Sequence, residues 1–107
     1  MTEAELQKRI TDLCDWLALK WHHETDSRKS KKGFPDLVIC GVRGIIFAEL
    51  KSERGRVTIE QDEWLLALLN SNAQQVYVRL WRPSGWDAIE EELKYLAGRT
   101  SSSPFTL

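Results

Sequence analysis

The sequence has little of what stabilises secreted, zinc-binding or membrane-spanning proteins. Its two cysteines, Cys14 and Cys40, are too far apart for a CxxC pair and too few for a disulfide framework. No internal repeat or zinc-type Cys/His spacing occurs, and no apolar run approaches the roughly twenty residues of a membrane-spanning helix. The acidic first residues lack the character of a signal peptide. We therefore expect two reduced, buried cysteines in a cytoplasmic protein with no membrane partner.

Neither sign of charge dominates the chain, which has 15 Lys/Arg and 16 Asp/Glu in 107 residues. The charges are nevertheless unevenly placed, because residues 20–56 have a net charge of +4, residues 1–19 of −2 and residues 57–107 of −3. A basic central segment is compatible with nucleic-acid binding, although such segments are often only solvated surface. The length and a hydrophobic content of 42% suit one globular domain.

Hydrophobic periodicity and turn residues predict a mixed α/β domain in the order α-β-β-β-α-β-α. Two helices are expected to begin with capping boxes, Thr2 with Glu5 and Thr58 with Gln61, and a third is expected to be capped by Asp87. The predicted elements are helices at 2–19, 58–70 and 87–97 and strands at 20–25, 36–40, 45–51 and 75–80. The helix between the last two strands predicts that this pair is parallel. We expect a domain at 1–98 and a flexible tail at 99–107.

The predicted hairpin places two acidic residues opposite each other. If Gly41 and Gly44 flank the turn symmetrically, Asp36 faces Glu49, and Lys51 lies on the same face of the sheet. Facing carboxylates destabilise a sheet unless a cation sits between them or one is protonated, and a Mg²⁺ ion uses one or two such ligands. A neighbouring lysine can orient water or stabilise charge on a phosphate. Two alternatives remain open: a bulge at the turn would shift the register, and these could be ordinary strand-end residues.

The residues around this hairpin resemble a known nuclease family. Gly33-Phe-Pro-Asp36, then Phe47-Ala-Glu-Leu-Lys51 and Ser52, then Gly55, and finally Gln61-x-x-Trp64 occur in the order typical of the PD-(D/E)XK nuclease superfamily. The pattern is most similar to the stand-alone VRR-NUC (virus-type replication-repair nuclease) domains of phages and bacteria. The resemblance implies a restriction-endonuclease-like fold and a metal-dependent endonuclease activity. It also implies that the protein acts in a bacterial or phage-infected host cell. Some members cut four-way DNA junctions as homodimers.

The resemblance also implies roles for individual residues. Asp36 and Glu49, with the backbone carbonyl of Leu50, would hold Mg²⁺ or Mn²⁺, and Lys51 would position the attacking water. Such nucleases usually add a glutamate from the first helix. We expect this to be Glu3, which lies on the apolar stripe with Leu6 and Ile10, whereas Glu5 has a capping role available.

The remaining candidates lie around this site. Gln61 matches a glutamine that assists the active site, although its capping position alone would explain it. The cations expected to bind DNA are Arg28, Lys29, Lys31, Lys32, Arg54 and Arg56. The tryptophans Trp16, Trp64 and Trp81 are expected in the core or at a dimer interface.

We expect a homodimeric endonuclease that acts on duplex or branched DNA, including Holliday junctions. We expect it to function in phage replication or in DNA repair. No organic cofactor is expected. Two alternatives remain open: a nickase or flap and single-strand nuclease, and a catalytically idle DNA-binding module with the same fold.

Overall fold

The computed structural model describes residues 1–24 and 32–105, and within them the predicted element order is confirmed. The elements are α1 (Glu3–Trp16), β1 (Lys20–His23), β2 (Leu37–Gly41), β3 (Gly44–Leu50), α2 (Ile59–Asn70), β4 (Val76–Trp81), the 3₁₀ turn η1 (Pro83–Gly85) and α3 (Trp86–Leu96). Both capping boxes form as predicted, at Thr2 with Glu5 and at Thr58 with Gln61. The chain therefore has the predicted mixed α/β, restriction-endonuclease-like architecture.

The four strands form one sheet in the order β1-β2-β3-β4, antiparallel except for the parallel β3–β4 pair. In the hairpin Gly41 pairs with Gly44 and Val38 with Phe47, so the symmetric register is confirmed and no bulge intervenes. The turn keeps this register because Gly44 adopts the positive φ (+139°) that Val42 would resist. Any Cβ at Gly44 would also lie 2.2 Å from the carbonyl oxygen of Gln75.

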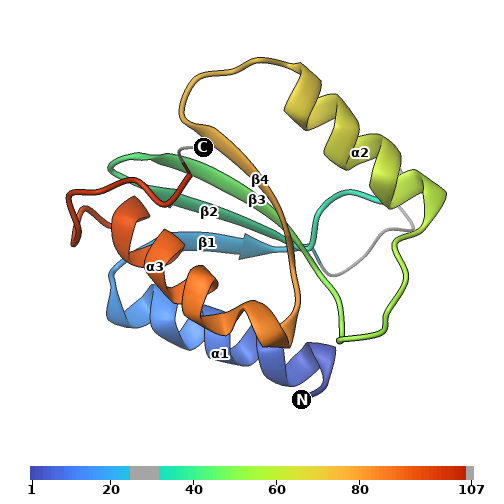
Figure 1. Ribbon diagram of the computed structural model, residues 1–107, viewed down its shortest axis with the longest axis horizontal. Helices are drawn as coiled ribbons and strands as arrows, with labels where there is room; N and C mark the ends of the chain where they lie inside the picture. Colours follow the sequence, from blue (N-terminus) through green and yellow to red (C-terminus); the bar gives the residue numbers. More distant parts are fainter. Residues whose placement is uncertain (25–31, 106–107) are drawn as a thin grey trace.

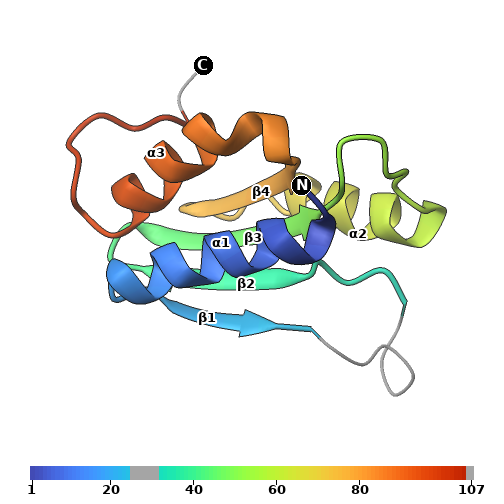
Figure 2. The ribbon, with the colours of Figure 1, turned by 90° about the horizontal axis from the view of Figure 1, so that it is seen from below.

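The two faces of the sheet are covered differently. Helices α1 and α3 lie side by side on one face, and α2 lies across the other (Figures 1 and 2). The main core fills the space beneath α1 and α3, and its fully buried strand residues are Leu37, Ile39, Ile46 and Ala48. Because strand side chains alternate, the intervening residues of β2 and β3 point to the α2 side. We call this second surface the α2 face.

Helix α2 is held on its face by aromatic packing from the loop before β2. Phe34 makes edge-to-face contacts with Phe47, at 6.1 Å between ring centroids, and with Trp64 of α2, at 5.0 Å. The preceding Gly33 has φ +93°, and a Cβ there would lie 2.4 Å from the backbone of Glu60. The residues Gly33 and Phe34 therefore dock the first turn of α2 next to the start of β2.

Part of the α2 face stays open to solvent. On the half formed by β1 and β2, Lys20 and His22 are exposed, and so is Cys40, which pairs with Lys20 across the strands. The expectation that both cysteines are buried is therefore wrong for Cys40, while Cys14 lies in the core. Sequence periodicity could not predict the exposure of Cys40, because an apolar strand has the same sequence pattern whether or not a helix covers its second face.

Trp16 is 80% exposed at the end of α1, so only the dimer-interface alternative remains for it, whereas Trp81 is buried and Trp64 half-buried. Two further predictions are corrected. Asp87 is not the N-cap of α3, because that helix begins at Trp86 after Gly85 and Asp87 lies within its first turn. The first helix ends at Trp16, two residues before Ala18 turns the chain with a φ of +58°.

The chain after α3 is packed against the domain as far as Phe105, where a free tail was expected. Phe105 stacks on Tyr77 of β4, with 3.8 Å between ring centroids, and Arg79 lies over its other side. Arg43 of the hairpin turn donates a hydrogen bond to the carbonyl of Thr100. These contacts extend the packed domain beyond residue 98.

Within the described part of the chain, no helix is long and apolar enough to cross a membrane.

The docking of α2 gives a first testable prediction. Gly33→Ala should lower the free energy of unfolding by at least about 1–3 kcal/mol, the cost of an unfavourable backbone conformation alone, because the Cβ also meets the Glu60 backbone. Gly85→Ala is the matched control, since nothing lies within 4 Å of its Cβ and its φ is −90°. It should change stability by less than about 0.5 kcal/mol. Urea denaturation of both variants measures the difference, and equal effects would contradict this account of α2 docking.

Candidate active site

Three charged side chains meet on the α2 face, where the β2–β3 hairpin opens. Leu37 pairs with Ala48, so the register continues to place Asp36 opposite Glu49, as predicted. The backbone N–H of Leu50 donates to Asp36 Oδ2 at 2.9 Å and fixes that carboxylate in place. Lys51 reaches back along its strand, and its Nζ lies 3.3 Å from Glu49 Oε2. The structure thus brings together the three residues that the sequence predicted to meet.

Glu49 is a buried acid with an unsatisfied oxygen. Its side chain is 2% exposed, and Oε1 has no hydrogen-bond partner among the described residues. Burial and the neighbouring negative charge of Asp36 together raise the pKa of Glu49 to about 7, although Lys51 opposes both effects. A buried, unpartnered carboxylate oxygen is costly, so the site favours an additional positive charge.

The donor set fits a hard divalent cation. Asp36 and Glu49 offer carboxylate oxygens from two adjacent strands, and one of these oxygens lacks any protein partner. Within residues 1–24 and 32–105 no group of three Asp, Glu, His or Cys side chains is close enough to hold a metal ion. Magnesium suits such a sparse set, because it accepts one or two carboxylates and retains several waters.

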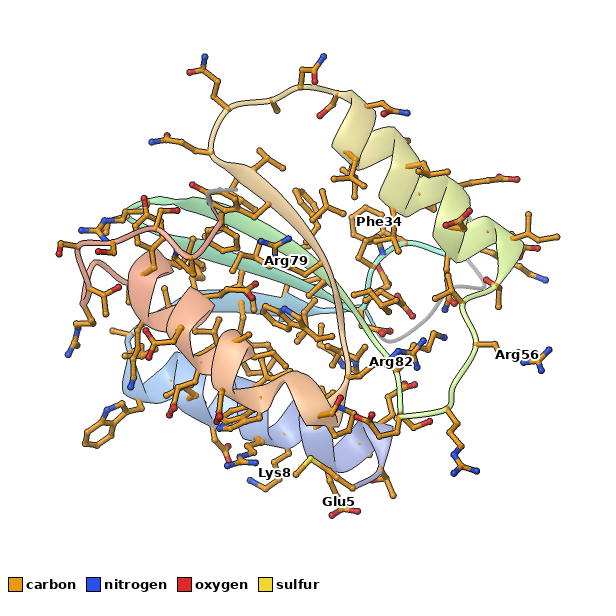
Figure 3. The ribbon with its side chains drawn as sticks, in the orientation of Figure 1. Glu5, Lys8, Phe34, Arg56, Arg79 and Arg82 are labelled. Atoms are coloured by element: carbon orange, nitrogen blue, oxygen red, sulfur yellow. The ribbon has the colours of Figure 1, made fainter. Side chains whose placement is uncertain are left out.

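The structure does not bring Glu3 to this pair. Glu3 is exposed in the first turn of α1, and the α1 stripe of Leu6 and Ile10 packs on the face of the sheet opposite the Asp36–Glu49 pair. Sharing a stripe with these core residues therefore directs Glu3 towards the wrong face. Glu5 accepts a hydrogen bond from the Thr2 N–H, which lowers the pKa of Glu5, and it points away from the sheet (Figure 3). A catalytic role for Glu3 stays a prediction.

Gln61 lies close to the site but is occupied as a helix cap. Its Oε1 accepts a hydrogen bond of 2.9 Å from the Thr58 N–H, and its own N–H donates to Thr58 Oγ1. The close approach of Gly33 to the Gln61 backbone places this turn beside the loop that leads to Asp36. Both interpretations of Gln61 thus remain, since capping and proximity to the site coexist.

The cations expected to bind DNA are only partly described. Arg28, Lys29 and Lys31 lie outside the described residues, whereas Lys32, Arg54 and Arg56 are exposed. Lys32 borders a hollow beside Glu60, Glu63 and Trp64 of α2. Arg54 and Arg56 belong to the loop after β3, from which Arg56 extends into solvent (Figure 3).

One residue beside the site was missed from the sequence. Arg82 follows β4, and its Nη1 donates to the carbonyls of Ser52 and Gly55, both at 2.8 Å, in the loop after Lys51. A signal was available, because β4 runs parallel to β3 and ends beside it. The residue after β4 must therefore lie near the residue that follows Lys51.

A second missed cluster lies on the opposite face of the sheet. Arg79 Nε donates to Glu92 Oε1 at 2.7 Å, and the Trp81 indole N–H donates to the same oxygen at 3.4 Å. Arg79 extends across the sheet (Figure 3), and Glu92 comes from α3. This pair satisfies the buried charge of Glu92 and ties α3 to β4 away from the candidate site.

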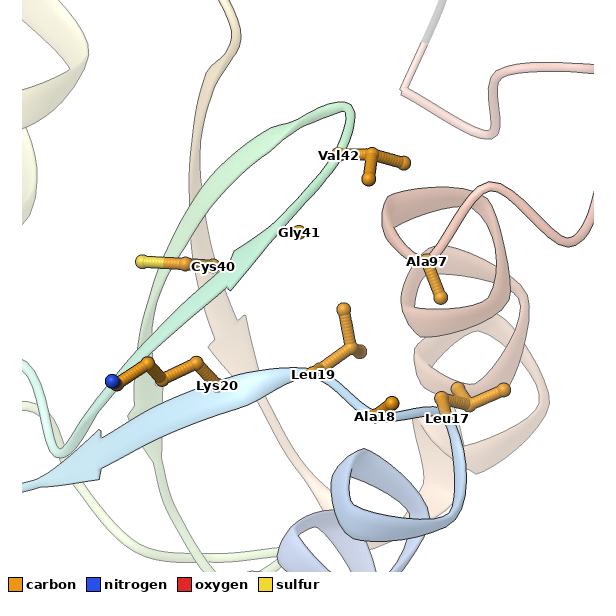
Figure 4. Close-up of a pocket in the computed structure, with 8 residues that line it drawn as sticks. All are labelled: Leu17, Ala18, Leu19, Lys20, Cys40, Gly41, Val42 and Ala97. Carbon is orange, nitrogen blue, oxygen red and sulfur yellow. The ribbon is translucent and has the colours of Figure 1, made fainter.

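Another hollow, of about 300 Å³, lies at the hairpin turn and has no acidic residue among the described residues that line it. It is lined mainly by small and apolar residues of the α1–β1 connection, the turn and the end of α3, including Leu19, Val42 and Ala97 (Figure 4). The turn is at the other end of β3 from Glu49, so this hollow is separate from the carboxylate pair.

The family model of the VRR-NUC domain matches residues 2–80, a segment that contains Asp36, Glu49, Lys51 and Gln61. The chain belongs to the VRR-NUC family. Membership of this family of nucleases gives the chain its functional class. No curated protein matches the chain.

Solved structures of VRR-NUC domains share the fold. One, described as a VRR_NUC domain protein, aligns with a TM-score of 0.67 and 19% identity over 90% of each chain. Another VRR_NUC domain aligns with a TM-score of 0.62 and 21% identity over 87% of this chain and 95% of that chain. Hjc of Archaeoglobus fulgidus, a Holliday junction resolvase, aligns with a TM-score of 0.45 and 21% identity over 71% of this chain and 67% of that chain. This last likeness is too loose to carry an argument.

The buried acid of this VRR-NUC domain predicts a stability that depends on pH. The pKa of Glu49 is raised in the fold from 4.5 to about 7, so its burial costs no stability below pH 4.5 and costs progressively more as the pH rises through 7. In the presence of a chelator, Glu49→Gln should therefore melt at least about 4 °C above wild type at about pH 8, the shift produced by about 1 kcal/mol. Near about pH 5 the two proteins should melt together.

Differential scanning fluorimetry of both proteins at the two pH values makes this measurement. Glu63→Gln, which alters an exposed acid on α2, is the control and should melt like wild type at both. Added MgCl₂ should raise the melting temperature of wild type more than that of Glu49→Gln, because a ligand of the folded state stabilises it by mass action. A Glu49→Gln difference that is the same at both pH values would contradict the assignment of buried charge.

Proposed function

We propose that this VRR-NUC domain is a Mg²⁺- or Mn²⁺-dependent endonuclease that hydrolyses phosphodiester bonds in DNA. The observation that carries this proposal is the buried, unpartnered Oε1 of Glu49 beside Asp36 and Lys51. A purely structural role would leave one oxygen of a buried carboxylate without a hydrogen bond among the described residues, which folded proteins avoid. A divalent cation held by both carboxylates relieves this deficit.

In the proposed mechanism Asp36 and Glu49 hold the cation, with the Leu50 backbone carbonyl as a further ligand. The Asp36 carboxylate is already oriented by the Leu50 N–H, so little rearrangement is needed. When bound, the ion makes water more acidic and offsets negative charge on the phosphate. Lys51 positions the attacking water and stabilises the charge that develops on the phosphate oxygens. Water forms the new P–O bond, one bridging P–O bond breaks, and the leaving oxygen departs with a proton. Gln61, in the first turn of α2, assists at the site.

DNA is proposed to approach along the open half of the α2 face. Lys20 and His22 are exposed there and lead towards Asp36, while Arg54 and Arg56 extend from the loop at the other side of the site. Lys32 adds a cation beside α2. Arg28, Lys29 and Lys31, which precede it in the sequence, are proposed as further DNA-binding residues and lie outside the described residues. These charges counter the repulsion between the acidic site and DNA phosphates, so binding should weaken with salt.

Each chain offers a single site of this kind, so cutting both strands of a duplex or a four-way junction calls for a homodimer. Helix α2 presents apolar side chains that the domain leaves exposed, namely Ile59 at 76%, Leu66 at 49% and Leu69 at 56%. They are a candidate dimer surface. Sedimentation velocity tests this part of the proposal, which a monomer at cleavage-active concentrations would contradict.

The catalytic proposal is tested by Lys51→Ala. The cleavage rate should fall by about 10²–10³-fold, because a group that stabilises the transition state is lost. The dissociation constant for DNA should rise by less than about tenfold, since only one of several cationic contacts is removed. Gel assays of cleavage with Mg²⁺ or Mn²⁺, and of binding with Ca²⁺, measure the two effects on four-way, flap, duplex and single-stranded DNA.

Lys8→Ala is the control for this experiment, because Lys8 is exposed on α1 and pairs only with Asp12 nearby. It should cut like wild type. Cleavage that survives Lys51→Ala or chelation would overturn the mechanism. Preference among the four substrates separates a junction-cutting enzyme from a nickase or flap nuclease, and binding without cleavage would identify an idle DNA-binding module.

A further inference from the structure

Arg82 clamps the loop that follows Lys51. Its Nη1 donates to the Ser52 and Gly55 carbonyls at 2.8 Å and to the Glu53 carbonyl at 3.2 Å. Nη1 carries two hydrogens, so three carbonyl oxygens saturate it and the longest contact shares a donor. Figure 3 shows Arg82 directed at this loop from the end of β4. A charged donor satisfies carbonyls that no strand pairing reaches.

The same short segment after β4 anchors the loop at two more points. The Lys51 N–H donates to the Trp81 carbonyl at 3.0 Å, which extends the parallel ladder by one residue. The Ser84 N–H donates to Glu53 Oε1 at 2.5 Å. Residues 81–84 therefore hold residues 51–55 through backbone and side-chain bonds, with Arg82 at the centre.

The clamped loop turns back against the side chain of Lys51. A Cβ built on Gly55 would lie 3.4 Å from Lys51 Cδ and 3.1 Å from Ser52 Oγ, so the Gly55 backbone runs close to the aliphatic part of the lysine. The Lys51 side chain is only 12% exposed, and its Nζ faces Glu49 at 3.3 Å. A lysine side chain is long and flexible, so a wall along its stem restricts where the ammonium can lie.

We propose that Arg82 is the positioning residue for Lys51. It acts through the Ser52–Gly55 loop: the guanidinium fixes the carbonyls of Ser52 and Gly55, and Gly55 then confines the lysine stem so that the ammonium stays beside Glu49. Arg82 does not touch substrate in this role. The positional claim stands on these contacts alone, and only its consequence for turnover rests on the proposed nuclease function.

The position of Lys51 can be measured without any cleavage. Native, metal-free protein is treated with a limiting amount of an N-hydroxysuccinimide acetate, and acetylation of Lys51 is compared by mass spectrometry with that of Lys8, whose side chain is 77% exposed. In wild type Lys51 should react slowly relative to Lys8. In Arg82→Met this ratio should rise at least about fivefold, because the loop opens locally once its charged hydrogen bonds are lost.

Arg43→Met is the matched control. Arg43 also donates from Nη1 to backbone carbonyls, those of Tyr95 and Thr100, but at the opposite end of the sheet. Arg43→Met should lower the melting temperature, because the same kind of hydrogen bond is lost. It should leave the ratio of Lys51 to Lys8 acetylation unchanged. An unchanged ratio in Arg82→Met, or an equal rise in both variants, would overturn the proposal.

Two milder variants keep the test informative if Arg82→Met does not fold. Arg82→Lys retains a cation with three donors on a shorter side chain, so it should restore part of the clamp and give a smaller rise in the ratio. Glu53→Ala removes only the Ser84 anchor of an exposed side chain and should also raise the ratio. A ratio that stays at the wild-type value in both variants would overturn the proposal.

The kinetic consequence separates positioning from DNA binding. In Arg82→Met kcat should fall by about 10- to 100-fold, as expected for a misplaced reactive group, while KM changes by less than about threefold. If Arg82 instead contacted a phosphate, KM would rise and the slope of log K against log[salt] would fall by about one, and positioning would be refuted. If wild type cuts no DNA, the nuclease proposal fails while the acetylation result still decides the role of Arg82.

Discussion

Two negative charges placed across one pair of strands are the constraint on which the rest of this structure depends. The register that makes β2 and β3 a regular hairpin also forces Asp36 to face Glu49, and burial removes the water that would screen the charge of Glu49. Within residues 1–24 and 32–105, Lys51 is the one cation that pairs with Glu49, and one of the Glu49 oxygens remains unsatisfied there. The arrangement is stable enough to persist because the other side of the same strands is a dry, close-packed core.

The short sequence motifs of the family make physical sense as parts of this arrangement. Gly33 lets the backbone of α2 approach the loop before β2, and Phe34 packs against Trp64 of α2. The Gly55 backbone runs beside the side chain of Lys51. Four of the motif positions therefore carry no reactive group. They build the walls that hold two carboxylates and an amine at fixed positions, which is the requirement for electrostatic catalysis.

The sequence was most informative where the relevant interactions are local. Counting from Gly41 and Gly44 predicted the hairpin register, and with it the meeting of Asp36 and Glu49, because strand pairing after a tight turn leaves few alternatives. It failed where distant segments decide the outcome. The exposure of Cys40 depends on how far α2 covers the sheet, and the position of Glu3 depends on which face of the sheet receives α1. No local pattern contains this information.

The two faces of the sheet have different roles, and this explains how a small domain tolerates a buried carboxylate with an unsatisfied oxygen. The face under α1 and α3 has the main core and a half-buried ion pair between Arg79 and Glu92, and Phe105 extends its packing. The α2 face is half open and holds Glu49, one of whose oxygens lacks a hydrogen-bond partner among the described residues. Because side chains alternate along each strand, neighbouring residues such as Ala48 and Glu49 contribute to opposite requirements. Even positions of β3 therefore build the main core, whereas odd positions face α2 and the candidate site.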